Sequence, residues 1–509
     1  MRSDIVNPNL IIRNSLYLFV RLLFVMAIAF YTTRLTLQIL GDIDYGINNI
    51  IGGVISMFAI ISMPVTGALQ RFFNVEFTKQ ELPGNVIFSS SIRIIAMLAL
   101  GMTILYETIG LYIINYILNY PPERTFAVNI IFQLTVATTI CSFFTLSYST
   151  LLFAKEEMGI PATIEIVSSV IKLVMLLLIP YVSLDVLICY SVIVLLISIF
   201  QFVFFFVYCN SKYEESRLTR QVNKDLQKDI LKFAGWSSIN AVAGISLTYL
   251  SNIFINVFGG VIYNTAYGIS QQLSNAVGSF STNLMRAVDP QITSSTVTDL
   301  DIYRNKIMLS SIKYSLLGVG FFYIIFVAYG HFLLKIWLGH VPNYAFDFCI
   351  ISLLNILFTS IILPLRTIIL ATGQIKGLFV DYGVMALVAN VIMFFSLLAG
   401  FPVIIVMYVI LLVGIASFVD AARIVVNLTS IQWLPIVLAI GKVFCCLLVG
   451  LTLMLVMKTW YKETFLSVIF VVFVTFLVVM ILSLSLVMTC EEKKYCLKLF
   501  YKLYAKCNY

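Results

Sequence analysis

The sequence predicts an all-α polytopic membrane protein that crosses the bilayer about fourteen times. Roughly fourteen apolar stretches lie between residues 15 and 488, each about long enough to span a hydrocarbon core. Hydrophobic residues make up 61% of the chain and charged residues only 11%, whereas an ordinary soluble domain carries about 25% charged residues. A soluble core could not bury so much apolar surface in 509 residues.

The spans are predicted to be helices, because backbone exposed to lipid must satisfy its own hydrogen bonds. Strands of a β-barrel would alternate apolar and polar residues, but these stretches are continuous apolar runs. We expect spans at roughly 15–39, 46–66, 86–108, 127–151, 160–180, 184–208, 232–256, 262–286, 306–330, 345–371, 376–398, 403–425, 435–457 and 464–488.

The basic residues gather in alternate loops and at both ends of the chain. The opposite set of loops holds only Arg124, Lys335, Lys458 and Lys462. The positive-inside rule therefore predicts that both termini are cytoplasmic, which an even number of spans also requires. The net charge of +8 comes from these loops and does not indicate nucleic-acid binding.

Two halves of the chain look repeated. Spans three to six and spans nine to twelve begin about 220 residues apart, and Tyr-Gly-Ile occurs at 45–47 and again at 267–269. Chance similarity among apolar segments is the alternative. The repeat predicts an N-terminal six-helix bundle at 1–210, a cytoplasmic linker at 211–231, a second six-helix bundle at 232–430, two further helices at 431–490 and a basic cytoplasmic tail at 491–509.

Nothing in the sequence calls for a cofactor or a metal. The nine cysteines form no CxxC pair, and the two histidines flank a single predicted outer loop, so we interpret the cysteines as small buried hydrophobes. No cleavable signal is evident, and no GxxxxGK[ST] loop indicates nucleotide hydrolysis.

The stretch YTTRLTLQILGDIDYGINNIIGGV at 31–54, followed by QRFFNVEF at 70–77, resembles the first two helices of bacterial polysaccharide (O-antigen and capsule) flippases. That family belongs to the multidrug/oligosaccharidyl-lipid/polysaccharide exporter superfamily. The matching features are Arg34, Leu40-Gly41, Tyr45-Gly46, Gly52-Gly53 and Gln70-Arg71-Phe72-Phe73, together with the turn ATGQIKG at 371–377.

The resemblance implies two six-helix bundles in a V around a central cavity. It also implies a flippase, not an enzyme, which moves a polyprenyl-pyrophosphate-linked oligosaccharide by alternating access across the bacterial inner membrane. The product would serve surface polysaccharide assembly (O-antigen of lipopolysaccharide, or capsule). The partners implied are membrane lipid, a polysaccharide polymerase and a chain-length protein, and no nucleic acid.

Charges at membrane depth are expensive and usually face a cavity or a partner. Cations outnumber anions six to three among them, which suits an anionic pyrophosphate. The candidate pyrophosphate contacts are Arg34, Arg21, Arg93, Lys172 and Arg366. Arg34 and Arg21 are about 140° apart around a helix, so both cannot face one cavity squarely, and the resemblance favours Arg34.

Each of these cations also has an interpretation that involves no substrate. Arg93, and Lys313 in span nine, are near helix ends and can extend to the interface, and Arg366 can cap its helix. Lys172 can form an ion pair between helices, with Glu165 two turns earlier on the same face. The acids Glu165, Asp381 and Asp420 are candidates for coupling to a proton or Na⁺.

Spans seven and eight carry polar stripes on otherwise apolar helices. Such a stripe suits a wet lining for sugar, because amides donate and accept hydrogen bonds, but it also suits packing between helices. The candidate lining residues are Asn240, Thr248, Asn252, Asn256, Tyr267, Gln271 and Asn275.

Other functions fit less well. A cation-coupled multidrug exporter of the sister family would favour acidic cavity residues over this excess of cations. A membrane polysaccharide polymerase or glycosyltransferase needs a large outer loop with catalytic groups, but the longest outer loops predicted here, near 109–126 and 331–344, are short. A purely structural scaffold is disfavoured by so many charges inside the spans.

Overall fold

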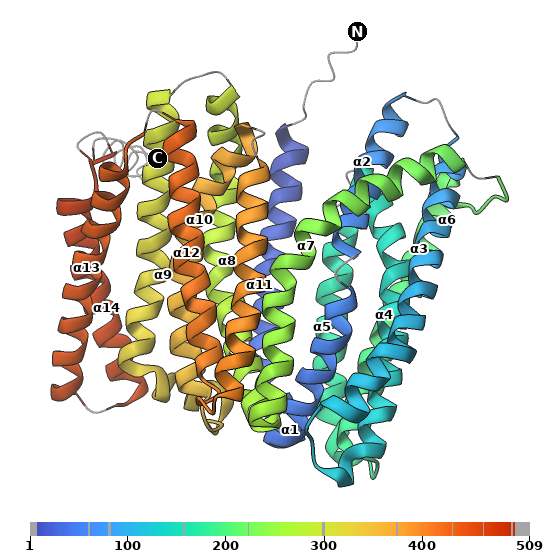
Figure 1. The fold of residues 1–509 in the computed structure, drawn as a ribbon, viewed down its shortest axis with the longest axis horizontal. Coiled ribbons are helices and arrows are strands. Elements are labelled where there is room, and N and C mark those ends of the chain that lie inside the picture. Colours follow the sequence, from blue (N-terminus) through green and yellow to red (C-terminus); the bar gives the residue numbers. More distant parts are fainter. Residues whose placement is uncertain are drawn as a thin grey trace, which may run out of the picture. The chain divides into compact units, whose positions relative to one another are not determined.

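A computed structural model describes residues 8–59, 62–79, 83–155, 157, 159–221, 223–297, 301–372, 375–429, 431–461, 463–489 and 492–493. Within these residues all regular secondary structure is helical and no strand occurs (Figure 1). The helices are α1 (Pro8–Ala59), α2 (Ser62–Lys79), α3 (Gly84–Leu105), α4 (Thr125–Ala154), α5 (Gly159–Leu178), α6 (Val186–Lys212), α7 (Lys224–Gly259), α8 (Val261–Val297), α9 (Asp301–Leu338), α10 (Ala345–Thr372), α11 (Ile375–Leu398), α12 (Ile405–Leu428), α13 (Trp433–Trp460) and α14 (Phe465–Leu482). Short π-helical turns extend α3 to Ile117 and α14 to Val487.

Eleven helical stretches among the described residues are long and apolar enough to cross a membrane. They are Phe24–Phe58, Gly84–Ile117, Pro122–Ala154, Gly159–Tyr181, Val186–Lys212, Asp301–Leu338, Ala345–Thr372, Val380–Leu398, Ile405–Leu428, Trp433–Trp460 and Phe465–Val487. The chain is therefore a multi-pass α-helical membrane protein. The finer count of fourteen stays a prediction, because spans one and two share one stretch and the polar-striped spans seven and eight are not among the eleven.

The join between the first two predicted spans is a kink rather than a loop. Helical structure runs through α1 except at Gly41, whose φ of 72° and ψ of 175° interrupt it. A residue with a side chain rarely adopts that conformation, so glycine is needed there. In the motif formed by Leu40-Gly41 and Tyr45-Gly46, a single residue, Gly41, thus changes the direction of the chain.

Contacts divide the chain into two compact units. The first contains the chain up to Gly268 together with Trp337–Asn343 and Ala386–Val406, and the second contains Ile269–Ile336, Tyr344–Met385 and the chain from Met407 onward. The division falls inside α8 and not at the predicted 211–231 linker. The bundle limits given above remain predictions.

In the first unit, α4 packs along α6, and α1 packs against α5 and α7 (Figure 1). Large aromatic side chains fill the core between them. Phe88 stacks on Phe73 with ring centroids 6.3 Å apart, and Tyr148 lies 5.0 Å from Phe88. The buried Tyr106 hydroxyl donates to the Ile55 carbonyl at 3.1 Å, which satisfies its one polar group.

Arg124 ties three elements of this unit together. Its guanidinium forms ion pairs with Asp44 of α1 and with Asp185, the latter at 2.5 Å. Asp185 also caps α6 by accepting from the amides of Leu187 at 3.0 Å and Ile188 at 3.2 Å. One of the few basic residues of the predicted outer loops is therefore a structural clamp.

The 211–231 segment is attached to the first unit and is not a free linker. It contains the end of α6, a 3₁₀ turn at Glu214–Ser216 and the first turns of α7. The Thr219 amide donates to the Ser89 hydroxyl at 2.8 Å and the Asn223 amide to Ser90 at 3.1 Å, both on α3. Lys155 pairs with Glu215 at 2.6 Å.

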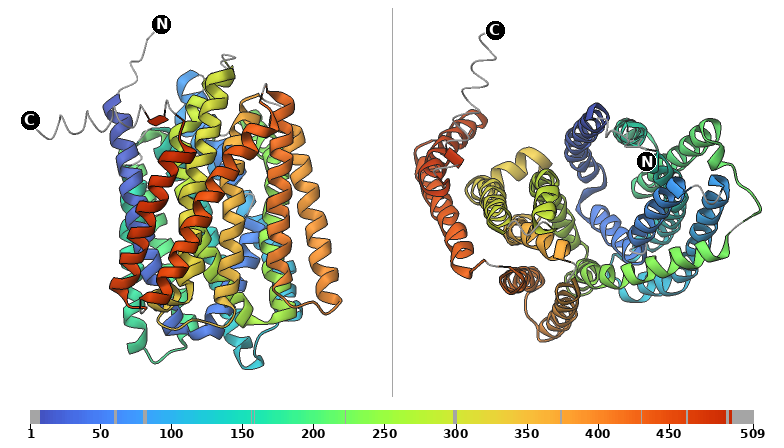
Figure 2. Two further views of the ribbon diagram at one scale, coloured as in Figure 1. Left: turned by 90° about the vertical axis from the view of Figure 1, so that its left-hand side faces the viewer. Right: turned by 90° about the horizontal axis from the view of Figure 1, so that it is seen from above.

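In the second unit, α13 and α14 lie side by side (Figure 2) and pack closely against α9. A methyl group on Gly320 of α9 would meet the Leu447 side chain of α13 at 2.2 Å. The Lys458 ammonium donates to the Ala328 carbonyl of α9 at 2.7 Å. The two additional helices are thus integrated into the unit and are not a loose appendix.

Candidate functional site

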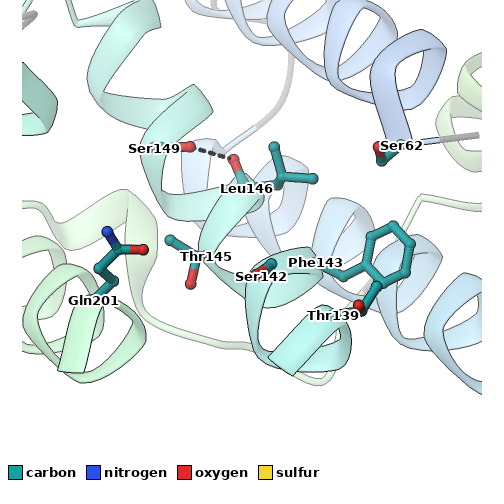
Figure 3. Close-up of a pocket in the computed structure, with 8 residues that line it drawn as sticks. All are labelled: Ser62, Thr139, Ser142, Phe143, Thr145, Leu146, Ser149 and Gln201. Carbon is teal, nitrogen blue, oxygen red and sulfur yellow. Dashed lines mark hydrogen bonds between the residues drawn. The ribbon is translucent and has the colours of Figure 1, made fainter. Parts of the chain in front are cut away.

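An uncharged cavity of about 280 Å³, lined by both polar and apolar residues, opens within the first unit (Figure 3). It is lined by Ser62 of α2, by Thr139, Ser142, Phe143, Thr145, Leu146 and Ser149 of α4, and by Gln201 of α6. Five hydroxyl groups and one amide therefore face a space with one aromatic ring and one aliphatic side chain. Such a lining fits a neutral, hydroxyl-rich ligand.

The α4 hydroxyls of this cavity already have acceptors for their protons. They donate to backbone carbonyls three or four residues earlier in the helix: Thr139 to Thr135, Ser142 to Thr138 and Thr145 to Cys141, each at 2.9 Å, and Ser149 to Leu146 at 3.0 Å. Because the protons are used, the oxygen lone pairs remain for a ligand that donates. Sugar hydroxyls are such donors.

Sequence reasoning missed this cavity, although the signal was present. Thr139, Ser142, Thr145 and Ser149 follow one another at three- and four-residue spacing in the predicted span 127–151, which places them on one helix face. Ser and Thr are common in membrane helices as packing residues, so the pattern alone does not separate a lining from an interface.

The structure brings together two of the predicted coupling acids. Arg423 of α12 donates to Asp381 of α11 at 3.1 Å and to Asp420 of α12 at 2.7 Å. With both acids ionised, this Asp381–Asp420–Arg423 cluster carries a formal charge of −1. Arg423 is not among the candidate cations named from the sequence, so its position between the acids is a finding of the structure.

Arg34, the leading cation, is half-buried on α1. The last turn of α9 and the loop that follows it contact α1 on both sides of Arg34. The Trp337 indole donates to the Phe30 carbonyl at 2.9 Å, and His340 bonds Asp42 at 2.8 Å. A Cβ on Gly339 of this loop would lie 3.9 Å from the Arg34 guanidinium.

The other predicted cations are placed separately. Arg93 is exposed on α3 and donates to the carbonyl of Arg220 at 2.9 Å. Lys172 lies 5.3 Å from the centre of the Tyr190 ring, a contact between α5 and α6, and Glu165 is half-buried on α5. Arg366 is exposed on α10, and the side chain of Arg21 lies outside the described residues.

Several predicted sugar-lining residues pack helices together instead. Asn252 and Asn256 of α7 are buried, and both bond Asn264 of α8, at 2.7 Å and 2.8 Å. Asn252 also donates to Asn49 of α1 at 3.3 Å, and Asn256 accepts from the Asn119 amide at 2.7 Å. These amides satisfy one another and join the helices in this structure. Their interpretation as cavity lining stays a prediction.

Tyr267 is buried as well, and its hydroxyl donates to the Thr248 carbonyl at 3.0 Å. The Thr248 and Asn275 side chains are exposed and that of Gln271 is half-buried, so these three keep a surface that a ligand can reach. The side chain of Asn240 lies outside the described part of the chain.

No protein-family model matches the chain, and no curated protein matches it. Solved structures do. The lipid II flippase MurJ, in an inward closed conformation, matches with a TM-score of 0.74 at 12% identity, over 93% of this chain and 98% of MurJ.

Two further matches are transporters of the MOP superfamily. An inward-facing multidrug resistance transporter of the MATE family has a TM-score of 0.61 at 12% identity, covering 81% of this chain and 98% of its own. A transporter from Pyrococcus furiosus, described as having a binding pocket of reverse polarity, has a TM-score of 0.54 at 12% identity, covering 82% of this chain and 96% of its own.

At such low identity these likenesses show the fold, which is that of MOP superfamily membrane transporters. The fold that the resemblance seen in the sequence implies agrees with these matches. The solved proteins that share the fold are described as a flippase and as a transporter. The narrower assignment to polysaccharide flippases is taken up below.

Proposed function

We propose that this protein is a flippase for a polyprenyl-pyrophosphate-linked oligosaccharide. The substrate moves from the inner to the outer leaflet of the bacterial inner membrane by alternating access, for O-antigen or capsule assembly. The observation that carries the proposal is the uncharged hydroxyl-rich cavity of the first unit, which suits sugar (Figure 3).

The extent of the structural matches supports a flippase over a drug exporter. The MurJ match covers 93% of this chain and the MATE match 81%, although each covers 98% of its own protein. The difference of about sixty residues is close to the combined length of α13 and α14, Trp433–Val487. MurJ is described as a flippase for a lipid.

In this proposal the pyrophosphate binds to cations and the sugars to neutral groups. Arg34 is the principal pyrophosphate contact, because a guanidinium donates two parallel hydrogen bonds to phosphate oxygens. Arg21, Lys172 and Arg366 are secondary candidates. Thr248, Gln271 and Asn275 remain candidate sugar contacts, of which Thr248 and Asn275 are exposed and Gln271 is half-buried. A polymerase with a chain-length protein takes the product.

A cation-coupled multidrug exporter is the second candidate, and the Asp381–Asp420–Arg423 cluster is the observation that favours it. Acids that release a proton or Na⁺ can drive export. In a flippase the same acids, together with Glu165, would couple transport to an ion gradient. Efflux of cationic dyes from vesicles, with no movement of lipid-linked sugar, would select the exporter.

The decisive experiment is a sidedness assay in proteoliposomes. Purified protein is reconstituted with a lipid-linked oligosaccharide labelled on the sugar, and an impermeant glycosidase outside reports which leaflet the sugar occupies. Protein-dependent exchange of the inaccessible fraction would support a flippase. Absence of exchange with a matched native substrate and an imposed membrane potential would contradict the proposal.

Arg34→Ala should lower the rate of flipping about tenfold or more, because a hydrogen bond between charged partners contributes about 1.5–3 kcal/mol. Arg93→Ala is the matched comparison and should have little effect, since that guanidinium contacts the Arg220 carbonyl. Equal losses in the two variants would remove Arg34 as the specific phosphate contact.

Thr145→Val tests the cavity by replacing a hydroxyl with a methyl group of nearly the same size. Loss of one acceptor should weaken sugar binding about fivefold, as expected for one neutral hydrogen bond of about 1 kcal/mol. The apparent affinity for soluble fragments of the oligosaccharide, measured by calorimetry, is the readout. An unchanged affinity would place the sugar elsewhere.

A further inference from the structure

A row of lysines lies on the exposed side of the first turns of α7, within the first unit. Lys224, Lys228 and Lys232 are all exposed, and none of them forms an ion pair with a described residue. Residues four apart lie on the same side of a helix, so the three occupy one side of α7 over about 12 Å. These three residues are named the lysine row below.

The side chains around these turns follow a definite order. Opposite the lysine row, Leu226 is 6% exposed and Ile230 is fully buried, so that side of the helix faces the bundle. At about 100° per residue, Asp225 and Asp229 flank the row on one side and Leu231 flanks it on the other. The two aspartates are exposed, and Leu231 is 41% exposed. The exposed part of the helix therefore runs from apolar through cationic to anionic.

That order matches the edge of a phospholipid leaflet. Acyl chains meet the phosphate layer there, and the phosphate layer meets water. An apolar side chain suits the first, a cation the second and an anion the third. A helix that lies in the membrane interface has basic residues beside apolar ones in this way. A lysine can also reach a phosphate while its methylene groups stay on apolar surface.

The first turns of α7 lie level with the end of the hydrocarbon layer. The membrane-length stretch Gly84–Ile117 has 34 residues, which is about 50 Å of helix against a hydrocarbon core of about 30 Å. With the excess shared between its two ends, the core begins about seven residues into α3. Ser90 is at that level. Its hydroxyl accepts from the Asn223 amide at 3.1 Å, and its carbonyl accepts from the Gln227 side chain at 3.3 Å.

The direction of the helix agrees with this placement. The first part of α7 crosses its neighbours α2 and α3 obliquely, whereas its later part runs along the bundle (Figure 1). A helix inclined in this way keeps several turns near one depth, so the whole lysine row can meet the phosphate layer.

We propose that the lysine row binds the headgroups of anionic phospholipids in the cytoplasmic leaflet, with Leu231 against the acyl chains and the two aspartates turned to water. The row is convex and spread along the helix, so it fits a layer of phosphates better than one small anion in a pocket. Arg220, exposed just before α7, adds a fourth cation. In the orientation predicted from the sequence, this end of the unit faces the cytoplasm, where the leaflet surface is anionic.

The test measures lipid contact at the row itself and needs no transport assay. The full chain is placed in phosphatidylcholine nanodiscs with a trace of photoactivatable phosphatidylglycerol or photoactivatable phosphatidylcholine, each reactive in its headgroup region. After illumination, mass spectrometry measures the labelling of the peptide that contains the lysine row. Phosphatidylglycerol should label it at least about tenfold more than phosphatidylcholine, since each lysine near an anionic surface contributes about fivefold.

Charge variants test the assignment to these residues. The triple variant Lys224→Gln/Lys228→Gln/Lys232→Gln should show at least about a tenfold fall in labelling by phosphatidylglycerol. Replacement of the same three lysines by arginine keeps the charge and should keep the preference. Asp225→Asn/Asp229→Asn should increase labelling by phosphatidylglycerol, because two neighbouring negative charges are removed.

Two controls separate this effect from general damage. Lys335→Gln removes an exposed lysine of α9, in the second unit, and should leave the labelling unchanged. A melting temperature for each variant confirms that it is folded.

Equal labelling by the two lipids would overturn the proposal and leave an acidic protein as the partner that the row fits. Wild-type preference in the folded triple variant would overturn it as well. So would loss of phosphatidylglycerol labelling on addition of an equimolar polyprenyl diphosphate, because the lysines would then hold the transported substrate. None of these outcomes depends on flipping, so the proposed function and the lipid surface can fail separately.

Discussion

Asn264 makes three hydrogen bonds to two residues of the first unit. It donates to the Asn252 side chain at 2.7 Å and to the Asn252 carbonyl at 3.0 Å, and it accepts from Asn256 at 2.8 Å. It is fully buried. In a membrane helix such an amide stabilises the contact between helices because no water replaces a lost bond.

Asn264→Leu should therefore destabilise the protein by about 2 kcal/mol, because three bonds are lost and each contributes on the order of 0.6–1.7 kcal/mol in a membrane. Thermal unfolding in detergent, followed by size-exclusion chromatography, measures the loss. Thr248→Val is the control, because its side chain is exposed and Tyr267 uses only its backbone carbonyl. A stable Asn264→Leu protein with reduced flipping would return these amides to the sugar site.

At this scale the residue types were predictable and their roles were not. The sequence showed that Asp381, Asp420, Asn252 and Asn256 are costly at membrane depth and must have polar surroundings. It did not show that the two aspartates meet around Arg423 or that the two asparagines bond Asn264. A partner on another helix depends on how the helices rotate and pack, which no spacing along one helix specifies.

Among the elements, α1 depends on a single residue for its course. Gly41 has a φ of 72°, and no atom outside its own helix turn lies within 4 Å of a Cβ built on it. The requirement for glycine is therefore conformational and not a matter of space. Gly52, later in the same helix, also has open space around it but has ordinary helical geometry.

Gly41→Ala should cost about 1–3 kcal/mol of stability, the usual cost of holding a side-chain residue in that region of conformational space. Gly52→Ala should be neutral or stabilise the protein by up to about 1 kcal/mol, because alanine favours a helix. The difference between the melting temperatures of the two variants measures the cost of placing a side chain at the kink. Equal melting temperatures would show that α1 bends without a special conformation at residue 41.

The segment that joins α6 to α7 is held by carboxylates, so its attachment should depend on pH. Burial acts to raise the pKa of Glu157, but hydrogen bonds from Lys212, Tyr213 and Tyr208 lower it below its ordinary 4.5. At Glu215 burial likewise acts to raise the pKa and the hydrogen bond from Lys155 to lower it, and the pKa is lowered overall. A carboxylate whose pKa is lowered by folding stabilises the folded state at pH values above its ordinary pKa. This stabilisation is lost as the pH falls below that value.

We expect amide hydrogens of residues 213–221 to exchange faster at pH 4 than at pH 7 after correction for intrinsic rates, and to do so progressively as the pH falls. The double variant Glu157→Gln/Glu215→Gln should show the faster exchange at pH 7. Glu214→Gln is the matched control, because Glu214 is 89% exposed and lies 3.9 Å from its partner Arg217. Unaltered exchange in the double variant would assign the attachment to Ser89 and Ser90 of α3 alone.

For the whole molecule, the extent of structural similarity is better evidence for the fold than any sequence motif. Identity to each matched structure is only 12%, yet nearly the whole chain superposes on MurJ. Apolar membrane helices tolerate almost any exchange of aliphatic residues, so sequence similarity is lost while the packing of helices is retained. The fold is therefore similar although the sequence identity is low.

The division into two units also belongs to this scale. The predicted repeat placed a boundary in the 211–231 segment, where polar residues break the apolar pattern. The contacts place α7 with the first unit instead, because its amides bond α1 and α8 residues there and its first turns lie on α3. Polar segments mark where the chain leaves the membrane. The boundary between two compact units lies instead where the contacts between helices are fewest, and the two positions need not coincide.

The sequence by itself determined that this is a polytopic α-helical membrane protein. Apolar length is a local property, and lipid leaves the backbone few other choices. It also determined which residues carry the charge and amide groups. Only the tertiary structure decided which of them pack, which form the acid–arginine cluster and which surround the cavity. Those outcomes depend on contacts between helices that are distant along the chain.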